Sequence, residues 1–188
     1  MKKAKMIAAT ALIGASFAGG IGATVHAESP NMTKTTNIKD EQKQMALNTL
    51  LGLYSKAQEG KVYGGFSDQF VVGETTRTEV YNSIGKPYSV EGNFEHYSGS
   101  MGQASYDFSY DKKGVLKEVR YFGTNVERQT NLGGITPDMM IKHLGKEDRT
   151  HIITGTNETN HIYDLGDYTL EFVESADHTI SHVNLVAQ

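Results

Sequence analysis

Apolar residues recur at intervals of three and four between Asp40 and Glu59, separated by lysine, glutamine and glutamate. This spacing predicts an amphipathic helix with one buried face. We expect Asp40 to cap its start and Gly60 to follow its end. The preceding residues, 28–38, are polar and lack periodicity, which predicts a disordered leader. The apolar positions of the helix are Met45, Leu47, Leu50, Leu51, Tyr54 and Ala57.

Further along the chain the apolar period changes from about 3.6 to two. In residues 104–110, Tyr106 and Phe108 alternate with Asp107 and Ser109. Strict alternation predicts antiparallel strands with one face on a core and the other in water. The same pattern predicts strands at 116–122, 168–172 and 180–186, with shorter ones at 93–98, 150–154 and 160–164.

A segment of the chain is repeated with an offset of 60 residues. Each copy predicts a short helix, because Thr76 and Thr136 are good N-cap residues and Pro137 suits a first helical position. A left-handed glycine is expected after each helix. Seven positions are alike in the two copies: Gly73 and Gly133, Thr76 and Thr136, Val80 and Met140, Tyr81 and Ile141, Ile84 and Leu144, Gly85 and Gly145, Lys86 and Lys146.

These patterns predict the α+β class. The expected fold is a tandem repeat of a short helix plus an antiparallel β-meander, with the helices packed on one face of the sheet. Residues 39–188 would form a single globular domain of two similar halves, 39–125 and 126–188. A duplicated unit this long sets the architecture, and we expect it to build a binding surface.

The helix-and-turn motif with Gly73, Thr76, Val80, Tyr81 and Gly85-Lys86-Pro87, followed by meandering strands and a second copy, resembles the YjgB-like family of secreted proteins from Gram-positive bacilli. The resemblance covers residues 45–188. More remotely, the repeat resembles the β-lactamase-inhibitor-protein-like fold and the SmpA-type assembly lipoproteins. The resemblance implies that the protein is extracellular, and the YjgB-like family has no established activity to carry over. The remoter relatives act by binding other proteins. The absence of cysteine here departs from both remoter groups.

The first 27 residues have the composition of a secretory signal. Lys2, Lys3 and Lys5 precede an apolar stretch, and Val25-His26-Ala27 supplies small residues for cleavage after Ala27. A retained membrane anchor is the alternative, but the many glycines and the cleavage site favour release. Because the chain has no cysteine, a lipoprotein attachment is excluded. The mature protein is therefore expected to be secreted.

The net charge of the expected mature protein limits the classes of partner that it can bind. Removing residues 1–27 takes away three lysines and no acid, which leaves 15 basic and 22 acidic residues and a net charge of −7. This balance argues against nucleic acid or an anionic membrane as partner. A secreted chain without cysteine has no disulfides, so its core alone must hold the fold. No cofactor is expected.

The strand alternation places charged side chains on the water-facing side of the predicted sheet. We expect them to form a solvent-facing cluster that binds an extracellular protein or a cell-wall component without catalysis. The candidate partner-binding residues are Asp107, Glu118, Arg120, Glu171 and His182.

Three other functions deserve consideration. A cell-envelope hydrolase would use paired acids among Asp107, Glu118 and Glu171, but an open face lacks the pocket that raises an acid's pKa. A metal site would use the histidines of the second half, but His178 and His182 lie on a turn and a strand, without helical spacing. A structural matrix protein is the third alternative. No metal or catalytic site is therefore expected.

Overall fold

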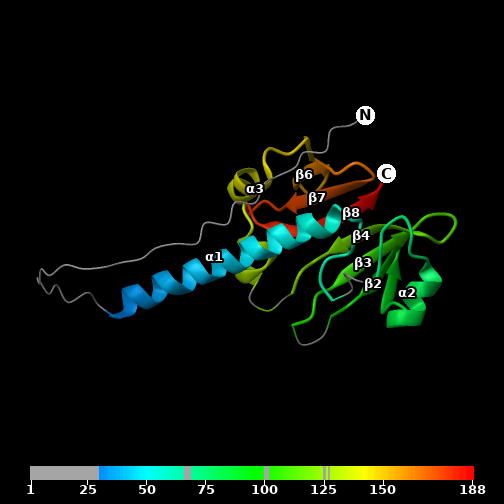
Figure 1. Ribbon diagram of the computed structural model, residues 1–188, viewed down its shortest axis with the longest axis horizontal. Helices are drawn as coiled ribbons and strands as arrows, with labels where there is room; N and C mark the ends of the chain where they lie inside the picture. The colour runs from blue at the N-terminus through cyan, green and yellow to red at the C-terminus, as the bar shows by residue number, and fades with distance from the viewer. Residues whose placement is uncertain (1–29, 66–68, 100–101, 125, 127) are drawn as a thin grey trace, which may run out of the picture.

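The computed structural model describes residues 30–65, 69–99, 102–124, 126 and 128–188. The expected signal peptide and its cleavage site lie outside the described residues. Within these ranges the chain forms a single antiparallel sheet of eight strands, three α-helices and two short 3₁₀ helices (Figure 1). The α+β class is therefore as predicted.

The long helix α1 spans Pro30–Ala57 and begins ten residues before the predicted start at Asp40. Residues 30–38, expected to be disordered, belong to this helix. Pro30 suits a first helical position because its missing N–H would have no partner there. Residues 31–51 contain no further proline and no glycine to interrupt the helix. Its N-terminal part extends past the strands (Figure 1).

The short helices α2 (Arg77–Ile84) and α3 (Pro137–Leu144) begin at the predicted caps. The Thr76 hydroxyl accepts a hydrogen bond from the Glu79 N–H, and the Glu79 carboxylate accepts one from the Thr76 N–H. Thr136 likewise accepts from the Met139 N–H. Both helices are therefore fixed at their starts by local sequence, as expected.

The glycines that end these helices are not in the predicted left-handed α-conformation. Gly85 has φ 83° and ψ −170°, and Gly145 has φ 88° and ψ −179°. Positive φ with ψ near 180° is a region that only glycine occupies without strain. Each glycine turns the chain from a helix into an extended segment, and the two conformations agree closely.

Seven strands match predicted segments and one was missed. The missed strand, β1 (Ser89–Glu91), has three exposed residues and is too short to show alternation. The other strands are β2 (Phe94–Tyr97), β3 (Tyr106–Tyr110), β4 (Leu116–Tyr121), β5 (Arg149–Ile152), β6 (Thr159–Asp164), β7 (Tyr168–Glu174) and β8 (Ile180–Ala187).

The order of strands in the sheet is β1-β2-β3-β4-β8-β7-β6-β5. Two meanders, β1–β4 and β5–β8, therefore meet at the antiparallel pair β4–β8, where Val119 is opposite Leu185. The 3₁₀ helices η1 (Arg128–Thr130) and η2 (Leu132–Gly134) lie between β4 and α3 in the chain.

The hydrophobic core combines alternate strand residues with residues of all three helices. Phe108 and Phe172 are fully buried, and they belong to the same cluster as Leu50 of α1, Val80 of α2 and Met140 of α3. The phenylalanines at the centre of each meander therefore face the core, as the alternation predicted.

We predict that Gly85→Ala and Gly145→Ala each destabilise the protein by about 1–3 kcal/mol, because a Cβ is strained at these φ and ψ values. An added Cβ would meet nothing within 4 Å at either site, so the loss would reflect the backbone alone. Urea unfolding measures it. Gly65→Ala is the control, since it also meets no neighbour and its φ is not positive. A loss at only one of the two sites would contradict their equivalence.

Candidate binding face

One row of paired residues crosses the sheet on the side opposite the hydrophobic core, which we call the outer face. The row contains one residue from each of the eight strands, joined by seven registered pairs. We call it the central row. In strand order it is Ser89, His96, Asp107, Arg120, Asn184, Glu171, Ile162 and Arg149.

The register brings the five candidate residues together on this face. Asp107, Arg120 and Glu171 lie in the central row itself. Glu118 precedes Arg120 by two residues on β4, and His182 precedes Asn184 by two residues on β8. Because strand side chains alternate between faces, residues two apart share a face. Sequence reasoning missed His96, Asn160 and Asn184 on the same surface.

In the first half of the sheet, close contacts between polar and charged side chains cover this face. The His96 Nδ1 lies 2.5 Å from an Asp107 carboxylate oxygen, and only 12% of the Asp107 side chain is exposed. Arg120 Nε donates to Glu118 at 2.9 Å, and its guanidinium lies 3.8 Å from the centre of the Phe94 ring. The prediction of a fully solvent-facing cluster is therefore wrong for Asp107, because the imidazole directly opposite on β2 covers it.

In the second half, two amides share one carboxylate. The Glu171 Oε2 accepts hydrogen bonds from the Nδ2 of Asn160 at 2.9 Å and of Asn184 at 3.2 Å. Asn160 and Asn184 are only 6% and 7% exposed. Their Oδ1 atoms are buried and have no hydrogen-bond partner. The second half therefore presents two unsatisfied amide oxygens, whereas the carboxylates of the first half are in contact with His96 and Arg120.

His182 is a neutral part of the face. Burial lowers its pKa to about 4, and the positive charge of Arg120 acts in the same direction. Its ring lies 5.3 Å from the Phe122 ring, and its Nδ1 is 2.7 Å from the Ser181 hydroxyl oxygen. The uncharged imidazole and Phe122 together form a small aromatic surface beside Asn184.

A separate polar cluster is centred on His161 and Glu174, at core-facing positions of β6 and β7, and includes residues outside the strands. His161 Nε2 is 2.8 Å from one Glu174 oxygen, and His178 Nδ1 is 2.7 Å from the other. Glu147 lies 3.7 Å from the His161 Nδ1. Burial acts to raise the pKa of Glu174, but hydrogen bonds from His161 and His178 outweigh it and lower that pKa. Sequence reasoning missed this cluster, although polar residues at inward positions of an alternating strand were a signal.

The first half has a counterpart in Glu95, a buried carboxylate on the core-facing side of β2. It accepts a hydrogen bond from the Tyr81 hydroxyl at 2.7 Å and lies 3.2 Å from Arg77 Nε.

Among the residues described, no group of three or more histidine, aspartate or glutamate side chains is arranged to hold a metal ion.

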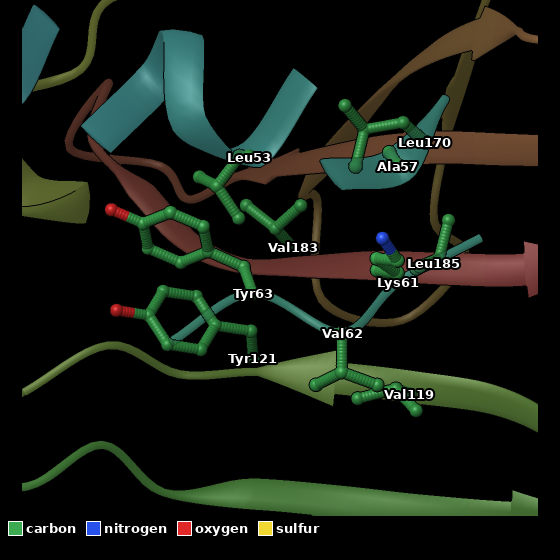
Figure 2. A pocket seen from close by; sticks show the side chains of 10 residues that line it. All are labelled: Leu53, Ala57, Lys61, Val62, Tyr63, Val119, Tyr121, Leu170, Val183 and Leu185. Atoms are coloured by element: carbon green, nitrogen blue, oxygen red, sulfur yellow. The ribbon is translucent and has the colours of Figure 1, made fainter. Parts of the chain in front are cut away.

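Two hollows of different size lie in the described part of the molecule, and both are away from the central row. The smaller, of about 20 Å³, lies between α1 and the central strands and is lined by apolar residues such as Leu53, Val119 and Val183, which Figure 2 labels. Ligand pockets typically enclose about 300–1,000 Å³. A surface groove of about 350 Å³ separates the N-terminal part of α1 from η1, with Ile38, Met45 and Arg128 among its walls. Neither adjoins the central row.

Comparison with known proteins identifies the family. The model of "Domain of unknown function (DUF4309)" matches residues 50–186. The chain belongs to the DUF4309 family. The match includes every residue of the central row. In addition, no described helix is long and apolar enough to cross a membrane.

This DUF4309 chain is similar to a protein of Bacillus subtilis in both sequence and structure. It is 35% identical over 192 residues to Uncharacterized protein YjgB of Bacillus subtilis (strain 168), covering all of both chains. The crystal structure of that YjgB, at 2.13 Å resolution, aligns with a TM-score of 0.72 and 38% identity, covering 77% of this chain and 99% of the other. A cysteine-rich secretory protein from Staphylococcus aureus aligns with a TM-score of 0.41 and 15% identity, covering 71% of this chain and 48% of the other.

We predict that His182 makes the DUF4309 domain sensitive to mild acid. The folded protein holds this imidazole neutral, whereas the unfolded chain protonates it near pH 6.5. The contribution of the neutral His182 to the free energy of unfolding is therefore complete above pH 6.5. It is lost as the pH falls toward 4, by about 1.4 kcal/mol per pH unit. His182→Gln should flatten this loss in urea unfolding at pH 7, 6, 5 and 4.5. His151→Gln, on an exposed edge-strand residue, is the control and should leave the slope unchanged.

We also predict that Glu174→Gln costs about 2 kcal/mol or more at pH 7, because charged hydrogen bonds to two histidines are lost. Glu174 has a lowered pKa when folded. The contribution of the ionised Glu174 to the free energy of unfolding is therefore present above the pKa that this carboxyl group has in the unfolded chain. That contribution is lost as the pH falls below this pKa and through the lower pKa of the folded state. The difference between variant and wild type in urea unfolding should shrink below about pH 4. Glu91→Gln, at an exposed carboxylate, should cost little at any pH.

Proposed function

We propose that this protein is secreted and binds an extracellular protein or a cell-wall component through its outer face, without catalysis. The observation that supports this proposal most directly is the central row, a continuous line of mostly polar residues across all eight strands. Its ends are the edge strands β1 and β5, so its length is on the order of 30 Å at the usual strand spacing. A row of this length suits an extended partner better than a small molecule.

We infer that the two halves arose by duplication. Each consists of a short helix followed by a four-stranded meander, and the order of strands is mirrored about the β4–β8 pair. The matching caps at Thr76 and Thr136 and the matching glycine conformations support this inference. The likeness to inhibitor-like and SmpA-type repeats rests on the sequence pattern and agrees with a binding role.

We further infer that all three helices cover the same face of the sheet. Buried residues of each helix belong to one cluster with the core-facing strand residues. That arrangement leaves the outer face to a partner. The basic, apolar start of the chain and the net charge of −7 after its removal favour release from the cell and a partner that is not strongly anionic.

The alternative, a cell-envelope hydrolase, receives less support. Its three candidate acids each have neighbours that hold them: Asp107 contacts His96, Glu118 pairs with Arg120, and Glu171 accepts from two asparagines. An acid catalyst needs a site that keeps it protonated. The described cavities do not adjoin these acids, so binding explains the face better.

The experiment uses protein recovered from culture medium, whose N-terminus should be Glu28 by mass spectrometry. The protein should co-sediment with purified peptidoglycan or capture a specific secreted protein. Arg120→Ala should weaken this at least fivefold, because it removes the charge at the centre of the row. Lys142→Ala, on an exposed residue of α3, is the control.

Equal loss in the control, or no capture of either partner class, would contradict the proposed face. Release of sugar fragments by wild type that is abolished by Glu118→Gln or Glu171→Gln in a folded protein would instead favour the hydrolase.

A further inference from the structure

Three side chains on the adjacent strands β6, β7 and β8 form a compact group within the outer face. We call Asn160, Glu171 and Asn184 the amide site. Glu171 and Asn184 are direct cross-strand partners, and Asn160 pairs with Val173, two residues after Glu171 on the same face. Both amide nitrogens donate to the same Glu171 oxygen. Because an amide's oxygen and nitrogen diverge from their shared carbon, the Oδ1 atoms do not take part in these two bonds and are directed away from the Glu171 oxygen.

These two oxygens are exceptional among the described residues. The buried side-chain atoms without a hydrogen-bond partner are His96 Nε2, Tyr110 OH, Asn160 Oδ1 and Asn184 Oδ1. Three of these four lie on the outer face, and two belong to the amide site. An unpaired buried acceptor is costly, and folded proteins rarely retain one. A donor supplied from outside the chain would satisfy both oxygens.

The surroundings of the amide site favour an uncharged donor. Arg120, opposite Asn184 on β4, contributes a positive charge, while Glu171 contributes a negative one. His182 beside them is neutral, and its ring with Phe122 offers an aromatic surface. A strongly cationic ligand would meet Arg120, and a strongly anionic one would meet Glu171. Hydroxyl and acetamido groups donate hydrogen bonds without charge, and a sugar ring also presents C–H groups to an aromatic surface.

From this geometry we propose that the amide site binds the hydroxyl or acetamido groups of a neutral glycan chain running along the central row. The proposal rests on the binding function proposed above and specifies its ligand class. Arg120 and His182, which are partly exposed, flank Asn184 and rotate aside to admit the donor. A glycan chain suits the row because both are extended and repeat polar groups at short intervals.

The experiment titrates secreted wild-type protein with the hexamer of N-acetylglucosamine in a calorimeter. We expect measurable binding that Asn160→Ala and Asn184→Ala each weaken at least fivefold. Thr169→Val is the matched control, because Thr169 is equally buried and precedes Glu171 by two residues on the same face. It should bind within twofold of wild type. The hexamer of glucosamine, which is cationic and lacks acetamido groups, should bind more weakly.

A second measurement covers the case in which an asparagine variant fails to fold. In the ¹⁵N-labelled wild type, the side-chain amide resonances of Asn160 and Asn184 should shift on addition of the N-acetylated hexamer, while those of Asn48, on α1, should not.

The outcomes separate this proposal from the binding function. Hexamer binding with unchanged asparagine resonances and unimpaired variants would overturn the amide site, and tighter binding of the glucosamine hexamer would overturn the neutral ligand class. Capture of a secreted protein through Arg120, with no response to either hexamer, would overturn the glycan proposal alone. Failure to bind peptidoglycan, hexamer and secreted proteins would overturn both.

Discussion

The antiparallel pairing of β4 with β8 is the contact on which the rest of the structure depends. It joins two four-stranded meanders into one sheet and places Arg120 opposite Asn184. A slip of one residue would move every side chain of one half to the opposite face. The core opposes such a slip, because Val119 and Tyr121 on β4 pack on the same side as Leu185 and Val183 on β8. The continuity of the outer face is therefore fixed by the apolar contacts on the other side.

This constraint explains why the outer face is polar and yet partly buried. Side chains on paired strands are close enough to interact directly. His96 therefore covers Asp107, and the two asparagines enclose a Glu171 oxygen. The longer Arg120 side chain reaches from β4 across β3 to lie over Phe94 on β2. Lateral pairing removes much of each charged group from water without any covering layer. The groups left unsatisfied are those for which no neighbour in the sheet supplies a donor.

The sequence predicted those parts of the fold that depend on local patterns. Alternation located seven strands, and the caps at Thr76 and Thr136 located two helices, because both signals act within a few residues. Prediction from the sequence failed where the structure depends on longer-range contacts or where an element is short. The edge strand β1 is too short to alternate, and the start of α1 at Pro30 was obscured by polar residues with weak helical preference.

The candidate surface was predictable to a similar extent. Alternation placed Asp107, Glu118, Arg120, Glu171 and His182 on one face, but it could not say which strands are neighbours. Only the order of the strands reveals that His96 covers Asp107 and that Asn184 stands beside Glu171. The inward polar residues Glu95 and His161 were missed for a related reason. Glu95 contacts Arg77 and Tyr81 on α2, and His161 contacts Glu174 on β7. These partners are distant in the sequence, so the local pattern does not reveal them.

Under the proposed duplication, the two halves have kept their backbone and diverged in chemistry at equivalent positions of the central row. Asp107 and Glu171 stand two strands from their respective edges, yet one contacts a histidine and the other two amides. Arg120 and Asn184 meet at the junction. A duplicated sheet can vary these residues independently, since the core on the other face sets the register and the glycine-ended helices set the turns. The outer face is therefore free to combine a charged half with an amide half, and an extended partner lying along the row would contact both.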